Sequence, residues 1–257
     1  MSLFKDLYQY REFLKTSIRK EFRGKYKKSF LGVLWSFINP LLQLLVYALV
    51  FPYIMRVQVE NYTMFLVVVL IPWNFFSSTV SQSTSVIIAS TGIIKKVYFP
   101  RAILPISNVT SNLLNFVISS IIVIAALLIS GIGIGPSIAI FPLVLLIQYI
   151  FSLAISFLLS SITVYIRDLE YFINVLMMLW FYVTPVLYSI DMIPDKFRNI
   201  LMLNPMTLII TTYREILYYK RIPDLGPLLI LGGICVVLLI IGYLIFNKCE
   251  KRFAEEL

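Results

Sequence analysis

Long stretches without a charged residue set the main constraint on how this chain can fold. The uncharged stretches cover residues 29–55, 61–94, 102–166, 171–190 and 225–247. A helix needs about 20 residues to cross the hydrocarbon core of a bilayer. Four stretches have room for one crossing each. The 65-residue stretch 102–166 has room for two, joined by the glycine-rich turn 131–136. With 60% hydrophobic and 14% charged residues, the composition exceeds what a soluble core can bury.

Six predicted membrane spans follow from these stretches, and they define the expected fold class. We expect an all-α integral membrane protein whose residues 1–257 form a single transmembrane domain. The predicted spans cover residues 33–55, 62–83, 106–130, 137–164, 171–190 and 226–247. Because their number is even, both termini are expected on the same side of the membrane.

The basic residues predict which side that is. Of the 22 Lys and Arg residues, sixteen lie in the N-terminal segment, the 84–105 loop, the 165–170 loop and the C-terminal tail, and six lie on the opposite side. Loops rich in Lys and Arg stay in the cytoplasm. We therefore expect a multi-pass protein of the cytoplasmic (inner) membrane with both termini in the cytoplasm. The net charge of +9 then serves orientation and contact with anionic membrane lipids, and no nucleic-acid partner is expected.

The N-terminal segment 1–30 has a helical pattern but is too charged to cross a bilayer. Its apolar residues recur every three or four positions at Leu3, Leu7, Tyr10, Leu14, Ile18 and Phe22. Basic residues fill much of the remainder. The pattern predicts an amphipathic helix that lies in the inner membrane interface. A solvated basic tail is the alternative.

The outer region 191–224 contains two apolar pieces that are each too short to cross the membrane. They are separated by Asn204 and Pro205. A proline lacks a backbone donor and biases the preceding residue to extended geometry, so a continuous helix is disfavoured here. We predict two short re-entrant helices with their turn at Asn204-Pro205. Helices that lie flat on the outer surface are the alternative.

Several kinds of chemistry lack their usual residues in this chain. There is no histidine, and Cys235 and Cys249 lie in different surroundings, so we expect neither a metal site nor a disulfide framework. The uncharged stretches lack the buried acids and bases that ion-coupled transporters use, and no glycine-rich phosphate loop is present. If the protein moves a solute uphill, the energy must come from another chain.

A membrane-bound glycan-transfer enzyme is the alternative outside transport. Such enzymes use clustered acidic residues to hold a divalent cation or to act as a general base. The acidic candidates here are Asp168, Glu170, Asp191, Asp195, Glu215 and Asp224. They form no tight motif, so we predict no catalytic residue and no enzymatic activity in this chain.

Polar and aromatic residues recur on one face of two predicted spans. In the first span these are Asn39, Gln43 and Tyr47, and in the fifth they are Asn174, Phe181 and Tyr188, with Trp180 and Thr184 beside them. Polar side chains often bond across helices in lipid, so helix packing is one interpretation. The other is a conduit walled by aromatic rings and amides, which suits sugars. Both interpretations remain open on the pattern alone.

The loop sequence IIKKVYFPRAILP at 93–105 is too rich in specific side chains for a simple turn. Its candidate contact residues are Lys95, Lys96, Tyr98, Phe99, Pro100 and Arg101. Aromatic residues with an arginine are common at protein interfaces, which predicts a docking site for the energy-supplying partner. The alternative for the two lysines is contact with the inner lipid surface.

Four stretches together resemble one transporter family. They are RKEFRGKYKKSFLGVLWSFINPLL at 19–42, IIKKVYFPRAILPI at 93–106, YIRDLEYF at 165–172, and YVTPVLYSIDMIPDKFRNILMLNPMTLIITTYREIL at 182–217. In this order they resemble the membrane permease subunit of ABC-type exporters of lipid-linked polysaccharides: O antigen, capsular polysaccharide or teichoic acid.

The resemblance implies a set of partners and roles. It implies a homodimer that works with two copies of a separate ATPase, which would bind ATP and magnesium, so this chain carries no cofactor. It implies a pore between the two permeases, walled by first and fifth spans, which favours the conduit interpretation. It makes 84–105 the coupling loop and 191–224 the re-entrant exit region. The implied substrate is an undecaprenyl-linked polysaccharide; an ABC exporter of another amphiphile, a lipid or a drug, is the alternative.

Overall fold

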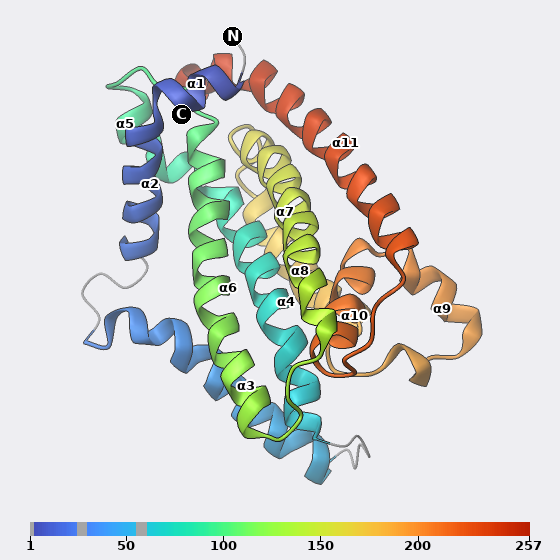
Figure 1. The fold of residues 1–257 in the computed structure, drawn as a ribbon. Helices are drawn as coiled ribbons and strands as arrows, with labels where there is room; N and C mark the ends of the chain where they lie inside the picture. The colour runs from blue at the N-terminus through green and yellow to red at the C-terminus, as the bar shows by residue number, and fades with distance from the viewer. Residues whose placement is uncertain (1–2, 25–29, 55–60) are drawn as a thin grey trace.

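The protein is described by a computed structural model that covers residues 3–24, 30–54 and 61–257 (Figure 1). Within these ranges the secondary structure is helical, with turns and no strand. The helices are α1 (Leu3–Gln9), α2 (Arg11–Gly24), α3 (Trp35–Ile54), α4 (Tyr62–Ser85), α5 (Thr91–Ile94), α6 (Ile103–Ile129), α7 (Phe141–Thr163), α8 (Leu169–Val183), α9 (Asp195–Met202), α10 (Pro205–Leu217), α11 (Leu225–Cys249) and α12 (Phe253–Glu256). The predicted segment 1–30 and span 33–55 lie partly outside the described residues.

Four of the described helical segments are long and apolar enough to cross a membrane. They are Tyr62–Ser85, Ile103–Ile129, Pro136–Thr163 and Leu225–Arg252. Their bounds agree closely with four of the predicted spans, and the integral membrane class is confirmed. The apolar helix α8 is shorter than predicted, because it ends at Val183 rather than continuing to residue 190. Thr184 precedes Pro185 and adopts extended geometry with ψ of 135°, as expected before proline.

Helix α4 forms the centre of the bundle and packs against α6, α7, α8 and α10. Phe65, Leu70 and Phe76 along it have no exposed surface. Helices α7 and α11 approach each other closely at Gly242, where an added β-carbon would lie 2.9 Å from the carbonyl oxygen of Ala154. The opposite face of α11 is apolar and exposed, as at Ile240, which suits contact with lipid.

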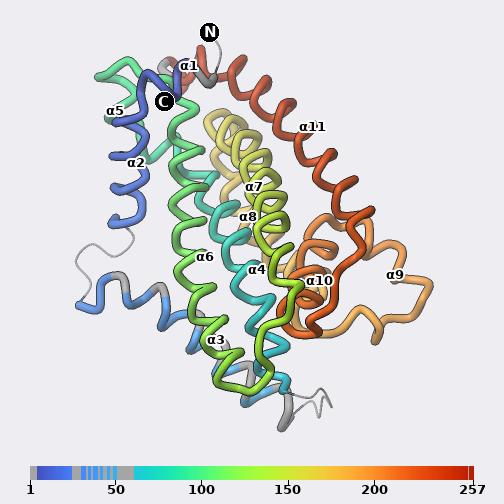
Figure 2. Tube along the Cα trace, in the orientation of Figure 1, coloured from blue at the N-terminus to red at the C-terminus, as the bar shows by residue number. Residues whose placement is uncertain are grey.

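The two ends of the bundle carry different segments. Both termini and α5 lie at one end, and α9, α10 and the 131–135 turn lie away from it (Figures 1 and 2). The Tyr165 hydroxyl, which follows α7, donates to the carbonyl of Cys249 at 3.3 Å and so belongs to the first end. The Lys220 ammonium donates to the carbonyl of Ile132 at 2.8 Å and ties α10 to the turn at the other. Helix α3 crosses α6 and α4 obliquely, away from the termini.

The amphipathic N-terminal segment forms two helices, because the chain turns at Tyr10 between α1 and α2. Helix α2 packs along the N-terminal half of α6. Leu7, Tyr10, Phe13 and Leu14 face the core, while Ile18 and Phe22 are half-buried and the side chain of Leu3 lies outside the described residues.

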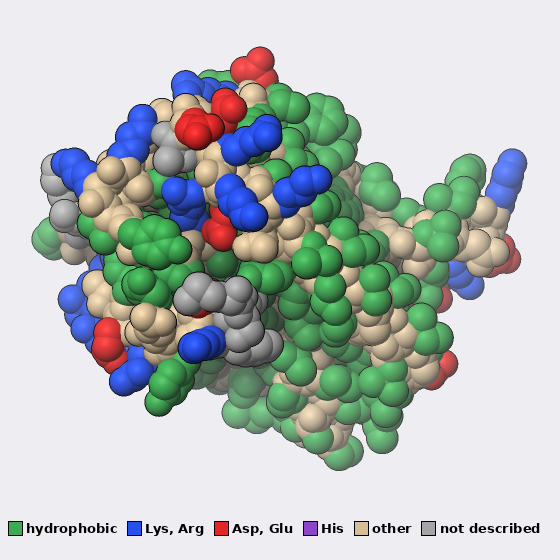
Figure 3. Space-filling model, turned by 90° about the horizontal axis from the view of Figure 1, so that it is seen from above, with side chains coloured by type: hydrophobic (Ala, Val, Ile, Leu, Met, Phe, Trp, Pro, Cys, Tyr) green, Lys and Arg blue, Asp and Glu red, His purple; other side chains and the backbone are tan. Residues whose placement is uncertain are grey.

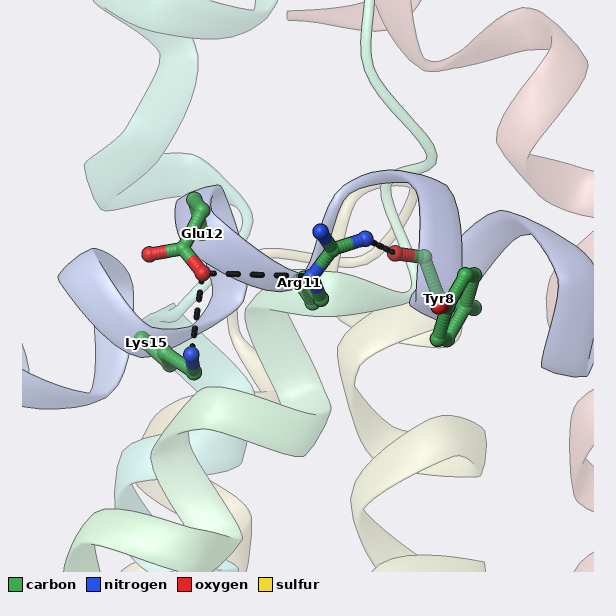
Figure 4. Close-up of polar contacts among 4 residues, drawn as sticks. All are labelled: Tyr8, Arg11, Glu12 and Lys15. Atoms are coloured by element: carbon green, nitrogen blue, oxygen red, sulfur yellow. Dashed lines mark hydrogen bonds and ion pairs between the residues drawn. The ribbon is translucent and has the colours of Figure 1, made fainter.

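Most charged side chains of this segment are exposed, and some of them make local contacts. Lys15 donates to Glu12 at 2.9 Å, and Arg11 donates to the carbonyl of Tyr8 at 3.2 Å (Figure 4). The hydrogen bond from Lys15 lowers the pKa of Glu12. The outer face of α1 and α2 is therefore charged, as expected for amphipathic helices.

Candidate functional site

An open groove runs between α4 and α8. Four of its lining residues belong to α4 and five to α8: Trp73, Asn74, Ser77, Ser81, Asn174, Met177, Met178, Phe181 and Tyr182. Amides and hydroxyls thus alternate with aromatic rings and thioethers along one path. Such walls bind hydroxyl-rich ligands, because rings offer flat apolar surface while amides donate and accept hydrogen bonds.

Helical spacing explains why these side chains share the groove. On α4, Asn74, Ser77 and Ser81 are three and four residues apart and lie on one face. On α8, Asn174 and Phe181 are seven residues apart, or two turns. The rings of Trp73 and Phe181 pack with centroids 5.6 Å apart and join the two walls.

Two of the predicted lining residues take part in this groove. Asn174 is exposed and Phe181 half-buried, and both line it. Asn39 is exposed on α3. The side chains of Gln43 and Tyr47 lie outside the described residues.

Trp180 and Thr184 lie toward α10 instead. The indole Nε1 of Trp180 donates to Asn204 Oδ1 at 2.9 Å, and its ring meets Phe76 edge-on with centroids 5.2 Å apart. Thr184 is fully buried and accepts from Asn204 Nδ2 at 3.0 Å. In this arrangement the side chains of Trp180 and Thr184 hold helices together. This agrees with helix packing, the first of the two interpretations of the polar and aromatic residues, rather than with a conduit.

The α4 wall was not predicted from the sequence. Its signal is the recurrence of hydroxyl and amide side chains at positions 74, 77, 78, 81, 82 and 85, within a stretch singled out only for lacking charge. The same helix also bonds inward, since Ser83 Oγ donates to Ser156 Oγ at 2.7 Å and Asn108 Nδ2 donates to Ser83 Oγ at 3.1 Å. Polar residues on α4 therefore divide between helix packing and groove lining.

The turn between α9 and α10 falls at Asn204 and Pro205, as predicted. Asn204 has extended geometry and caps α10, because its Oδ1 accepts from the Met206 backbone at 3.0 Å. Pro205 occupies the first turn, where a missing N–H costs nothing. Tyr188, half-buried, donates to the carbonyl of Tyr182 at 2.9 Å, so the chain after α8 folds back over that helix's end.

The predicted coupling loop has an anchored part and an exposed tip. Phe99 is buried against Phe13 of α2, with ring centroids 4.7 Å apart. Arg101 Nη1 donates to the backbone carbonyl of Glu250, which follows α11, and Pro100 is half-buried. These contacts tie the loop to both terminal segments.

The tip comprises Lys95, Lys96, Val97 and Tyr98, which are exposed, Tyr98 by 85%. Viewed from above, Lys and Arg side chains gather over this end of the molecule (Figure 3). A basic surface with an exposed aromatic residue is suited to contact with another macromolecule or with lipid head groups.

A helical bundle with four described segments that are long and apolar enough to cross a membrane defines a multi-pass membrane protein. The chain belongs to the ABC-2 type transporter family, whose model matches residues 12–218. The family resemblance found in the motifs is thereby confirmed.

Curated relatives extend the match to nearly the whole chain. The O-antigen export system permease protein RfbA of Myxococcus xanthus is 40% identical over 261 residues, which is 99% of each chain. The protein of the same name from Klebsiella pneumoniae is 40% identical over 239 residues, covering 92% of this chain and 91% of the relative. The polysialic acid transport protein KpsM of Escherichia coli is more distant, at 22% identity over 242 residues.

Proposed function

We propose that this chain is the membrane permease subunit of an ATP-driven exporter that moves an undecaprenyl-linked polysaccharide across the cytoplasmic membrane. O antigen is the first candidate for the polymer, since relatives named for O-antigen export match over nearly their full length. Capsular polysaccharide or teichoic acid is the next.

The observation that carries the substrate class is the groove between α4 and α8. Phe181 and Tyr182 offer ring faces to the C–H faces of sugar rings, with the buried Trp73 packed behind Phe181, and Asn74 and Asn174 offer amides to sugar hydroxyls. Several weak contacts of this kind hold a polymer without trapping it, which suits movement along the wall. An exporter of lipids or drugs needs fewer amides and hydroxyls along its path.

The proposed channel lies between two copies of the chain. The groove is open on one side, and the neighbouring face of α8 exposes apolar residues such as Phe172, Val175 and Leu179. A second copy that covers this face closes the groove into a conduit. Asn39, Gln43 and Tyr47 of α3 are the proposed lining residues of the adjoining wall, with Tyr188 near the exit.

The proposed topology has six spans: α3, α4, α6, α7, the shorter α8, and α11. Helices α9 and α10 form the re-entrant region on the outer side. Because basic residues gather with the termini, that end is assigned to the cytoplasm (Figure 3). The chain is then a single transmembrane domain of the inner membrane.

Energy in this proposal comes from two copies of a separate ATPase, which bind ATP and magnesium. The exposed tip of Lys95, Lys96 and Tyr98 is the docking contact, and Phe99, Pro100 and Arg101 hold the loop in place from behind. This chain then contributes the path and the ATPase contributes the chemistry.

Reconstitution with the partner ATPase tests the proposal. We expect a lipid-linked polysaccharide to stimulate ATP hydrolysis and to reach the far side of a proteoliposome. Stimulation by lipids or drugs instead would favour the other exporter class. Sugar transfer by the purified chain alone would favour the glycan-transfer enzyme.

A further inference from the structure

Arg214 is a buried arginine of α10 that binds backbone carbonyls. Its side chain is 2% exposed. Nη1 donates to the carbonyls of Pro185 at 2.9 Å and Tyr188 at 3.2 Å, and Nη2 donates to the carbonyl of Val186 at 2.9 Å. None of the ion pairs among the described residues involves Arg214. The guanidinium therefore directs both of its Nη atoms to one short segment of backbone.

That segment, residues 184–188, is the first stretch after α8, and we call it the post-α8 segment. It has no helix, so its carbonyls lack the partners that a helix supplies. The Tyr62 hydroxyl of α4 donates to the carbonyl of Leu187 at 2.9 Å. Four consecutive carbonyls, from residue 185 to residue 188, thus accept hydrogen bonds from just two side chains. Buried backbone needs such partners.

An aromatic surface holds the guanidinium from its other side. Arg214 Cζ lies 3.8 Å from the centre of the Phe65 ring. The rings of Tyr62 and Tyr218 pack on Phe65 with centroids 5.8 and 5.6 Å away. A planar guanidinium stacks on a ring and still directs a fork of N–H donors to several acceptors, whereas a lysine ammonium is a compact point charge. The arrangement therefore requires arginine.

We propose that Arg214 is a positioning residue for transport: it locks the post-α8 segment to α10, so that the outer end of the channel-wall helix α8 and α10 move as one unit. This inference rests on the proposed function, because it assigns α8 to the channel wall. Asn204 gives a second link between the same two helices through Trp180 and Thr184. With links at both ends of α10, sliding of α8 past it would break buried hydrogen bonds.

The test uses a reporter cysteine and the complete complex with its ATPase. Ser189→Cys, just beyond the post-α8 segment, is placed in a chain whose Cys235 and Cys249 are changed to alanine. The labelling rate by a membrane-impermeant maleimide is compared between this background and the same chain with Arg214→Gln or Arg214→Lys. Arg198→Gln is the matched control, because Arg198 lies nearby on α9 and makes only ion pairs with Asp191 and Asp195 at 3.8 and 3.4 Å.

We expect Arg214→Gln to raise the labelling rate about tenfold and to lower export per ATP hydrolysed by a similar factor, because a fork of charge-assisted bonds is lost. Arg214→Lys should behave like Arg214→Gln despite keeping its charge, and Arg198→Gln should match the background. If Arg214 had a purely structural role, its variants would lower the yield of assembled complex. The complex that does assemble would then keep the background labelling rate and the background export per ATP hydrolysed. Background-level labelling and coupling in both Arg214 variants would overturn the proposal.

If Arg214→Gln does not assemble, Tyr62→Phe replaces it, because this change removes one donor and keeps the ring stack on Phe65. Its labelling rate should rise by about twofold to threefold, the effect of a single neutral hydrogen bond, and an unchanged rate would overturn the proposal. The labelling result does not depend on the substrate. If polysaccharide does not stimulate ATP hydrolysis by the wild-type complex, the proposed function is contradicted. The labelling rates still decide whether Arg214 locks the segment.

Discussion

The two irregular segments at opposite ends of the bundle are held in opposite ways. Residues 95–101 are fastened only at their end, by the buried ring of Phe99 and by the hydrogen bond from Arg101 to backbone, while the tip at 95–98 stays exposed. The post-α8 segment has its carbonyls bound one after another by Arg214 and Tyr62, and Val186 within it has no exposed surface.

The difference separates two tasks. A segment with a buried anchor and an exposed tip presents side chains to a partner, as docking loops do. A segment whose successive carbonyls are bound by side chains of other helices is held in place, and it transmits the position of one helix to another. On this account force enters through side chains at the inner end and is carried by backbone contacts at the outer end.

The largest expected effect is at the inner anchor. Phe99→Ala removes a buried ring that packs on Phe13, and loss of a buried phenylalanine costs about 3 kcal/mol. We expect a lower unfolding temperature of the purified complex and weaker association with the ATPase. Phe99→Leu, which keeps most of the apolar contact, should recover most of both. Equal behaviour of the alanine variant and the wild type would show that Phe99 does not anchor the loop.

A somewhat smaller effect is expected at Asn204, whose side chain links α8 to the start of α10. Asn204→Leu removes the cap of α10 and the partners of Trp180 and Thr184, together worth about 2 kcal/mol. Thermal unfolding should detect it, with Asn199→Leu on the exposed face of α9 as the control. If Asn204→Leu and Asn199→Leu have the same unfolding temperature, the polar contacts of Asn204 do not stabilise this end of the bundle.

The exposed tip should affect binding and leave stability unchanged. Tyr98→Ala removes a side chain that is 85% exposed, so the unfolding temperature should not move. An aromatic residue at the centre of an interface contributes about 2 kcal/mol to affinity, so co-purification with the ATPase should fall sharply. Unaltered co-purification would assign the tip to the lipid surface instead.

The smallest perturbation is a test of sidedness that should leave activity intact. Cysteines at Ile134 and Lys96 are both exposed, and only Ile134→Cys should react with an impermeant label added outside the cell. Ile134 is preferable to Gly135, where a β-carbon would lie 2.9 Å from Cβ of Lys220. The reverse labelling pattern would invert the topology.

Local patterns predicted the long helices well. The uncharged stretches gave α4, α6 and α11 to within a few residues, because charge cannot enter the apolar interior and marks where a helix must stop. The same reasoning predicted a fifth span that is too long at its end, because the absence of charge does not reveal that the helix stops before Thr184 and Pro185. It also missed the break at Tyr10 between α1 and α2.

The site was harder to predict because its contacts join distant parts of the chain. Asn174 and Phe181 were found by their spacing on one helix face. Their partners on α4 come about 100 positions earlier, and no periodicity connects them. The hydrogen bond from Arg214 to the carbonyl of Val186 joins residues 28 positions apart. Its acceptor is a backbone carbonyl, which every residue type has, so the sequence does not reveal it.

Photo-crosslinking from the groove during turnover tests the central claim most directly. A photoreactive amino acid at Met178, which lines the groove, should form an adduct with the lipid-linked polysaccharide while ATP is hydrolysed. The same probe at Ile240, equally apolar and exposed on α11, should not. Adducts from Met178 alone are the predicted result. No adduct from Met178, or equal adducts from both positions, would contradict a polysaccharide path along α4 and α8.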